Sequence, residues 1–233
     1  MVEKGSAIPK LAWNKYGAAR SAATACVLGM GIGAGLAITL LSETTKGFGL
    51  YIFGLCVFHM WEYLWVAMYH PNNLSVDSFL LNHSPEFNMA LFAGFCEYWI
   101  EWYFFPGLKS FTTLYWIAAA AMVFGQVVRT LAMITAGSNF THLVQEEKRK
   151  DHVLVTSGIY QYFRHPSYFG WFVWSISTQI VLLNPICVIA YYYASWKFFS
   201  ERIENEEDNL IDFFGDAYRQ YRKKVWSGIP FVK

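Results

Sequence analysis

Apolar residues in this chain gather into long blocks separated by shorter polar stretches. An apolar helix of about 20 residues matches the hydrocarbon thickness of a bilayer. The pattern therefore predicts an all-α, polytopic integral membrane protein with about six transmembrane helices. The six blocks cover approximately residues 22–41, 48–68, 87–105, 114–136, 167–183 and 185–199.

The blocks also predict how the chain is organised. The fifth and sixth blocks are separated only by Asn184 and Pro185, so their helices are expected to form a tight hairpin. The first block carries alternate glycines between residues 29 and 35, and such small residues let neighbouring helices approach closely. We expect a region of four transmembrane helices over residues 1–136. Residues 137–233 are expected to form a second region, with a polar loop, the hairpin and a C-terminal amphipathic helix.

Charge adds an orientation to this picture. Charged residues make up only 15% of the chain, and a net charge of +1 gives no field that would attract nucleic acid. Lysine and arginine concentrate before the first block, after the fourth and after the sixth, whereas the short loops of the other side carry only Lys46 and Lys109. This bias predicts that both termini and the long loops are cytosolic. The sequons at Asn73, Asn82 and Asn139 are then expected to remain unglycosylated.

The cysteines argue against a metal centre. All four lie singly inside apolar blocks, and no pair has the spacing of a zinc site. We therefore expect no metal and interpret these side chains as small buried hydrophobic groups. The four cysteines are Cys26, Cys56, Cys96 and Cys187.

Four ionisable residues interrupt the apolar blocks: Glu62, Glu97, Glu101 and Arg129. Such residues are costly in lipid and usually face the protein interior or a partner. Glu97 and Glu101 are four residues apart on one helix face, and Arg129 is a candidate counter-ion on the next helix. A structural ion pair and a functional role both remain open here.

Candidate chemistry begins after the fourth block. The stretch from Gln145 to Tyr168 is polar, and Pro166 is suited to the first turn of the fifth helix. Arg164, His165 and Ser167 therefore lie at a helix N-terminus, where free backbone N–H groups suit a carboxylate. The sixth block continues into a charged stretch in which Arg202 and Glu206 share a helix face.

This charged stretch has two interpretations. By itself it is typical of a solvated helix with intrahelical salt bridges. The aromatic segment over residues 213–221 alternates apolar and charged residues at helical spacing, so it is expected to pack back on the membrane interface. That packing would turn the charged stretch into one wall of a pocket. Glu207 lies about 100° around the helix from Glu206, and the sequence leaves open which of the two faces the pocket.

Three elements together resemble the isoprenylcysteine carboxyl methyltransferase family. They are the run from Gly158 to Gly170 containing Arg164-His165-Pro166-Ser167-Tyr168, the hairpin at Asn184-Pro185, and the helix with Arg202-x-x-x-Glu206-Glu207 followed by Phe214-Gly215 and Tyr218. The segments 75–84 and 135–140 are similar to the eukaryotic branch in particular. The resemblance covers nearly all of the chain after about residue 48, and the broader family includes phospholipid N-methyltransferases.

The resemblance implies an enzyme of the endoplasmic reticulum membrane that uses S-adenosyl-L-methionine and releases S-adenosyl-L-homocysteine. Its substrate would be a C-terminal S-prenylcysteine, exposed by CaaX proteolysis on proteins such as small GTPases and lamins. Arg202 would bind this substrate. The cofactor would be held by Gln145, His152, Val153, Leu154, Val155, Tyr160, His165, Pro166, Ser167, Tyr168 and Glu206, with Glu207 as an additional candidate.

The expected chemistry is simple. An α-carboxyl group has a pKa of about 3.3–3.7, so the nucleophile is already ionised and needs no general base. Direct transfer requires only that its oxygen lie about 3–3.5 Å from the methyl group. A prenyl chain partitions into lipid, so a lipid-side opening is expected. Aromatic candidates for its lining, each equally compatible with simple packing, are Trp99, Trp102, Trp116, Trp171 and Trp174.

Three alternatives remain at this point. A phospholipid N-methyltransferase of the broader family would methylate an amine, for which Arg202 is badly suited. A sterol reductase has a loosely similar C-terminal region and uses NADPH, whose phosphate Lys223 and Lys224 could bind. A non-enzymatic scaffold would leave the polar residues after Ala136 without a role.

Overall fold

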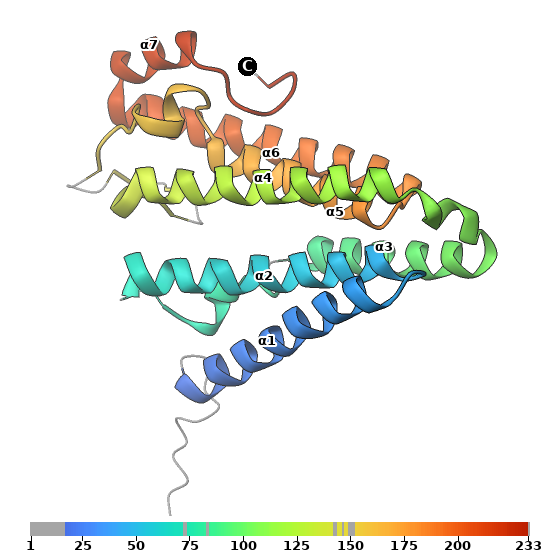
Figure 1. Ribbon diagram of the computed structural model, residues 1–233. Coiled ribbons are helices and arrows are strands. Elements are labelled where there is room, and N and C mark those ends of the chain that lie inside the picture. Colours follow the sequence, from blue (N-terminus) through green and yellow to red (C-terminus); the bar gives the residue numbers. More distant parts are fainter. Residues whose placement is uncertain are drawn as a thin grey trace, which may run out of the picture. The chain divides into compact units, whose positions relative to one another are not determined.

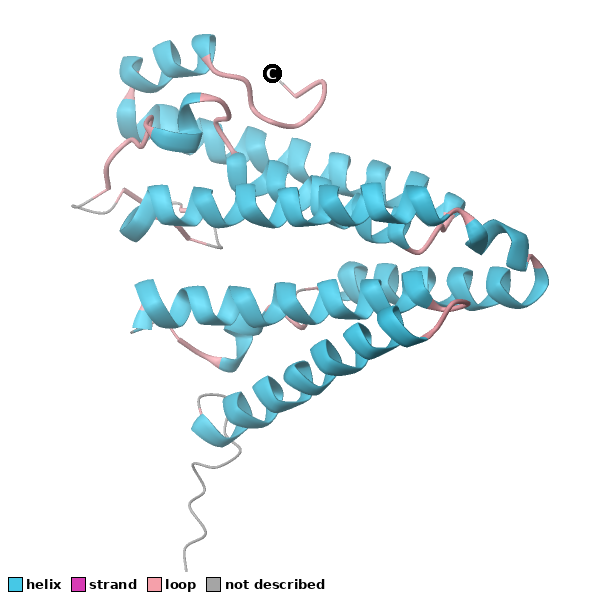
Figure 2. Ribbon diagram, viewed as in Figure 1, coloured by secondary structure: helices cyan, strands magenta, loops and turns pink. Residues whose placement is uncertain are grey.

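The computed structural model describes residues 17–71, 74–82, 84–141, 144–145, 147–148 and 152–232. Within them the chain is helical, and Figures 1 and 2 show the order of its elements. The α-helices are α1 (Ala18–Leu41), α2 (Lys46–Tyr69), α3 (Pro85–Phe104), α4 (Thr112–Ala136), α5 (Pro166–Val181), α6 (Pro185–Phe214) and α7 (Asp216–Lys224). Short 3-10 helices are η2 (Val76–Phe79), η3 (Pro106–Ser110), η4 (Gly137–Asn139) and η5 (Gly158–Gln161).

The predicted all-α class is confirmed, and each apolar block coincides with one of the helices α1 to α6. Among the described residues, three helices are both long and apolar enough to cross a membrane, namely Ala18–Leu41, Lys46–Tyr69 and Thr113–Asn139. The helix α5 is shorter, at 16 residues, and α6 becomes charged in its second half. The chain is thus a multi-pass membrane protein, and a total of six spans stays a prediction.

The chain divides into two compact units, Met1–Phe92 and Ala93–Lys233. In the first unit, α1 and α2 pack closely through glycines. A Cβ atom at Gly35 would lie 2.6 Å from the Phe53 backbone nitrogen, and one at Gly49 would lie 2.6 Å from the Thr39 nitrogen. Small residues at this contact are therefore a steric requirement, as the glycine pattern predicts. Gly33 has open space around it and takes no part in the contact.

In the second unit, α4 packs against α5 at a glycine on each helix. A Cβ atom on Gly125 would lie 2.6 Å from the Gly170 carbonyl oxygen, so neither position has room for a side chain. The hairpin between α5 and α6 turns at Asn184, as predicted, and α6 then runs without interruption for 30 residues. This length carries the helix from the hairpin to the charged residues around Glu206.

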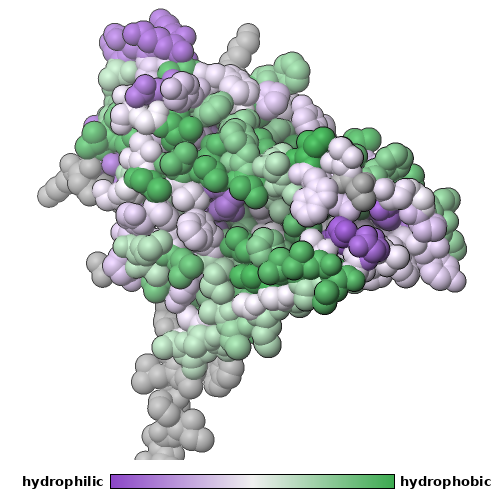
Figure 3. All heavy atoms as spheres, in the orientation of Figure 1, coloured by the Kyte–Doolittle hydropathy of each residue, from purple (hydrophilic) through white to green (hydrophobic). Residues whose placement is uncertain are grey.

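The C-terminal segment after α7 returns to the hairpin and completes its core (Figure 1). Ile229 is fully buried in a cluster with Phe172 of α5 and Phe199 of α6. Trp196 of α6 donates a hydrogen bond of 2.8 Å from its indole nitrogen to the Pro230 carbonyl. Figure 3 shows hydrophilic atoms gathered over α7 and apolar atoms over much of the helical surface.

Glu97 and Glu101 of α3 have partners other than the expected Arg129. Glu101 pairs with Lys109 at 2.7 Å. The two carboxylate oxygens of Glu97 accept hydrogen bonds of 2.7 Å from the first backbone N–H groups of α6, those of Ile186 and Cys187. Arg129 instead donates to the Ser167 hydroxyl at 2.8 Å. The prediction that Arg129 is their counter-ion is wrong, because it points toward α5.

Candidate active site

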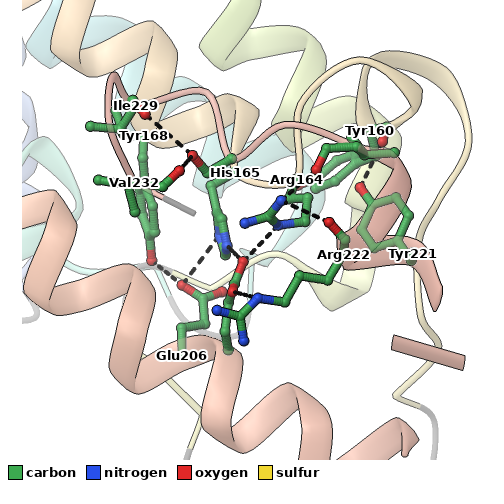
Figure 4. Close-up of polar contacts among 12 residues, drawn as sticks. Tyr160, Arg164, His165, Tyr168, Glu206, Tyr221, Arg222, Ile229 and Val232 are labelled. Carbon is green, nitrogen blue, oxygen red and sulfur yellow. Dashed lines mark hydrogen bonds and ion pairs between the residues drawn. The ribbon is translucent and has the colours of Figure 1, made fainter. Parts of the chain in front are cut away.

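The first turn of α5 and the middle of α6 place three polar side chains in one line. The Arg202 guanidinium donates from Nε to the Tyr168 hydroxyl at 2.9 Å. That hydroxyl in turn donates to Glu206 Oε2 at 2.5 Å. Arg202 and Glu206 are one helical turn apart, so a single hydroxyl can lie between them. The predicted shared face of α6 is confirmed, because both side chains contact the Tyr168 hydroxyl. Figure 4 shows Glu206 directed toward Tyr168.

His165 precedes α5 and is held on two sides. Its ring stacks on Tyr168, with ring centroids 5.5 Å apart and an interplanar angle of 5°. Its Nε2 atom lies 3.1 Å from Glu207 Oε1, and its Nδ1 atom lies 3.9 Å from Glu206 Oε2. The imidazole is buried, so these contacts fix its orientation.

Glu206 and Glu207 have different surroundings. The Glu207 side chain is 1% exposed, with Arg164 Nε at 2.7 Å and Arg222 Nε at 2.8 Å. Burial tends to raise the pKa of the Glu207 carboxyl, but the His165 hydrogen bond and charge, and then Arg164, outweigh it and lower the pKa. Glu206 is 28% exposed and lines a pocket. Glu206 therefore faces the pocket, whereas Glu207 does not line it.

The pocket is a partly open hollow, and its empty volume of about 600 Å³ includes open solvent. Its wall combines the end of α4, the segment before α5 and the second half of α6. The lining residues are Asn139, Phe140, Thr141, Gln145, His152, Tyr160, Arg164, His165, Pro166, Ser167, Tyr168, Glu206, Asn209, Leu210 and Phe213.

The sequence predicted about half of the residues that line this pocket. Eight of the expected cofactor residues line it: Gln145, His152, Tyr160, His165, Pro166, Ser167, Tyr168 and Glu206. Three residues of the strip after His152, namely Val153, Leu154 and Val155, are not among the lining residues, and Val153 is 63% exposed. Arg202 and Glu207 are also outside the lining, and both contact residues that belong to it.

Seven lining residues were not among the expected cofactor residues: Asn139, Phe140, Thr141, Arg164, Asn209, Leu210 and Phe213. A signal for three of them was present in the sequence. Asn209, Leu210 and Phe213 follow Glu206 at three, four and seven residues, which is the spacing of one helix face. Extending the face of Glu206 along α6 would have found them. The end of α4 has no comparable signal, because its approach to α5 is a tertiary contact.

Two asparagines of the wall hold neighbouring backbone. Asn139 accepts a hydrogen bond of 3.0 Å from the Val153 N–H, and Asn209 donates one of 3.0 Å to the Gln145 carbonyl. The Tyr221 hydroxyl of α7 donates to the Tyr160 carbonyl at 2.6 Å. Burial, and then the negative charge of Glu206, raise the pKa of the Tyr160 phenol, so this hydroxyl stays protonated. The pocket wall thus combines hydrogen-bond donors and acceptors with the Glu206 carboxylate and the Arg164 guanidinium.

Comparisons with known proteins point to one family. A family model described as the isoprenylcysteine carboxyl methyltransferase family matches residues 116–212. A relative from Dictyostelium discoideum, named protein-S-isoprenylcysteine O-methyltransferase, is 69% identical over 223 residues, which cover 96% of this chain and 94% of the relative. The Homo sapiens protein of the same name is 48% identical over 209 residues, or 90% of this chain and 74% of that protein.

The chain belongs to the isoprenylcysteine carboxyl methyltransferase family. A solved structure of the eukaryotic intramembrane Ras methyltransferase, an isoprenylcysteine carboxyl methyltransferase, superimposes with a TM-score of 0.91. It is 48% identical and covers 94% of this chain and 79% of its own. The expectation of an enzyme of this family is confirmed, and the phospholipid methyltransferase, sterol reductase and scaffold alternatives are not favoured.

Proposed function

We propose that this protein transfers a methyl group from S-adenosyl-L-methionine to the α-carboxylate of a C-terminal S-prenylcysteine. The observation that carries the proposal is the pocket lined by His165, Tyr168 and Glu206. The chain that forms it is 69% identical to a protein named protein-S-isoprenylcysteine O-methyltransferase. The pocket lies at the end of one helix that is apolar enough to span a membrane, Thr113–Asn139. A polar cofactor and a lipid-linked substrate can therefore meet at one site.

The pocket wall fits the chemistry of this cofactor. The ammonium and ribose hydroxyls need acceptors, which Glu206 and the Gln145 side chain supply. A carboxylate needs donors, which the His165 ring and the backbone N–H of Ser167, in the first turn of α5, would supply. The purine needs an apolar face, and the rings of Tyr160, Phe140 and Phe213 line the same pocket. When bound, the cofactor supplies a methyl group on a positively charged sulfur.

The protein's task in this reaction is to orient the acceptor. A prenylcysteine carboxylate is ionised at neutral pH, so no residue has to remove a proton. Arg202 is suited to bind it, because a guanidinium holds a carboxylate in a fixed fork. The guanidinium lies over the rings of Tyr168 and Phe198, at 5.4 and 5.9 Å from their centroids, which restricts its direction. One carboxylate oxygen must remain available for the methyl group.

A row of aromatic rings in contact leads from the pocket toward the core of the hairpin. Tyr168 stacks on Phe199 at 5.1 Å, and Trp171 meets Phe199 edge-on at 5.4 Å. We propose that the prenyl chain lies near these rings, in contact with lipid, where water is excluded. Excluding water strengthens the attraction between the carboxylate and a positively charged sulfur. Of the other tryptophan candidates, Trp174 is buried and Trp116 is exposed.

The cellular setting follows from the same proposal. The enzyme would reside in the endoplasmic reticulum membrane, with the pocket and both termini cytosolic and residues 137–233 as the catalytic region. Its substrates would be CaaX-processed proteins such as small GTPases and lamins. If this orientation holds, Asn82 and Asn139 gain no glycan in cells. A glycosidase-sensitive gel shift that disappears in Asn139→Gln would contradict the orientation.

A methyl-transfer assay tests the proposed function. Purified protein in liposomes is given tritiated S-adenosylmethionine and N-acetyl-S-farnesylcysteine, and base-labile methyl ester is counted. The expected result is ester formation that requires the farnesyl group, with N-acetylcysteine as the negative substrate. Label appearing in phosphatidylethanolamine instead would favour the lipid methyltransferase. Absence of ester from folded protein would overturn the proposal.

A further inference from the structure

A buried ionic cluster centred on Glu207 lies behind the pocket wall. Figure 4 labels three of its members, Arg164, His165 and Arg222. Its carboxylate binds His165 Nε2 at 3.1 Å, Arg164 Nε at 2.7 Å and Arg222 Nε at 2.8 Å. These partners come from the segment before α5 and from α7. Glu207 itself does not line the pocket, and the mechanism above assigns it no contact with a reacting group.

The same cluster holds the C-terminal segment in place. Arg164 Nη1 donates to the Arg222 carbonyl at 3.2 Å and also to the Val225 carbonyl. The main chain continues this contact, since the N–H groups of Arg164 and His165 donate to the carbonyls of Trp226 at 2.8 Å and Ser227 at 3.1 Å. His165 is therefore fixed through its backbone by the C-terminal segment and through its ring by Glu207.

We propose that Glu207 is a positioning residue for the cofactor, acting through His165 and tying the C-terminal segment to the pocket wall. The inference rests on the proposed function, because it concerns the same pocket. The physical reason is the acceptor that Glu207 gives to the His165 ring. An acceptor on one ring nitrogen sets the direction in which the other nitrogen points. Here the other nitrogen points toward Glu206, which faces the pocket.

The ring orientation also sets the positions of two neighbours. His165 is parallel to Tyr168, whose hydroxyl contacts both Arg202 and Glu206. A tilted imidazole would disturb this stack and shift the donors and acceptors that meet the cofactor. The prenyl chain should be affected less, because its proposed contacts, Phe199 and Trp171, pack in the hairpin core.

The decisive experiment compares Michaelis constants in Glu207→Gln. Glutamine keeps the shape and one acceptor oxygen, but it cannot neutralise two arginines. We expect the KM for S-adenosylmethionine to rise about 10- to 100-fold, by analogy with the loss seen when the partner that orients a metal-binding histidine is removed. The KM for N-acetyl-S-farnesylcysteine is expected to change less than about 3-fold, because orientation, rather than the lipid contact, is lost.

A pair of variants on α7 gives a matched control that spares the buried carboxylate. Arg222 and Arg219 are both arginines on α7, but Arg222 pairs with Glu207 whereas Arg219 pairs with the exposed Asp216 at 3.0 Å. Arg222→Gln is expected to raise the cofactor KM by about 3- to 10-fold, since its partial exposure weakens the pair. Arg219→Gln is expected to leave both constants unchanged.

The outcomes separate this inference from the proposed function. If the unmodified protein makes no methyl ester, the proposed function is wrong. If it is active and Glu207→Gln raises both Michaelis constants equally or neither, the positioning role is wrong. If Glu207→Gln does not yield folded protein, the two arginine variants decide, and equal cofactor KM values for Arg222→Gln and Arg219→Gln would overturn the inference.

Discussion

Two buried ionic clusters lie near opposite ends of α6, and they differ in whether they border the pocket. At the hairpin end, the Lys109 ammonium meets Glu101 at 2.7 Å, the carbonyls of Leu182 and Leu183 at 2.9 Å, and Asn184 Oδ1 at 3.0 Å. Nearly all of these contacts join Lys109 to the turn between α5 and α6. The cluster is closed on itself and borders none of the pocket.

At the other end of α6, the cluster around Glu207 is equally buried but borders a cavity. Its neighbours His165 and Glu206 present polar atoms to the pocket, and their other contacts hold them in a fixed orientation. The comparison shows that a buried charge can be used in two ways. Around Lys109 it fixes the turn of a helical hairpin, and around Glu207 it orients a binding wall. Variants at the two ends should therefore affect different measurements.

The largest effect is expected from Arg202→Ala and Glu206→Ala at the pocket end. Each removes a charged group that meets a ligand in the proposed mechanism, so kcat/KM for methyl transfer should fall about 10²- to 10³-fold. Farnesylcysteine methylation in liposomes is the measurement. The exposed Glu201 of α6 gives the control, and Glu201→Ala should retain full activity. Fully active, folded Arg202→Ala and Glu206→Ala would contradict the assigned site.

The next largest effect is expected at the hairpin end, on stability. Lys109→Met leaves Glu101 as a buried carboxylate without its cation, which costs about 3–5 kcal/mol. The thermal midpoint in detergent should fall, while both Michaelis constants of the folded fraction stay near those of the parent protein. An unchanged midpoint together with a raised cofactor KM would show that the two clusters are not separate in function.

A smaller effect is expected between the two ends, where α4 and α5 touch. In Gly170→Ala, the new Cβ atom would lie 2.7 Å from the Arg129 backbone nitrogen. The helices must separate, at a cost of about 1–3 kcal/mol, and the bond from Arg129 to Ser167 at the pocket should lengthen. Both the thermal midpoint and activity should fall. Gly33→Ala, a position with open space, should change neither.

The smallest expected effect is a pH dependence of stability from Glu207. Its pKa is lowered in the folded protein, so it contributes stability above the usual glutamate pKa of about 4.3. That stability is lost as the pH falls through the lowered value. The thermal midpoint should therefore drop on acidification below about pH 4.3, and Glu207→Gln should show a shallower drop. Identical acid profiles would remove Glu207 as a source of this dependence.

Local sequence pattern predicted α1 to α5 and the first half of α6 well, because each of these is a single apolar block. The hairpin at Asn184 and the joint face of Arg202 and Glu206 followed from spacing alone. The partners of Glu97 and Glu101 could not be predicted from spacing. Lys109 lies in the loop after α3, and its position depends on how that loop meets the hairpin. Periodicity along one helix contains no information about such a contact.

The sequence by itself determined that this chain crosses a membrane, that its polar residues concentrate after Ala136, and to which family it belongs. Those properties depend on composition and on motifs that are continuous along the chain. Only the tertiary structure decided that Glu206 faces the pocket while Glu207 is buried behind it. The two side chains are adjacent in sequence, and the approach of α7 and the C-terminal segment to Arg164 and His165 is what distinguishes them.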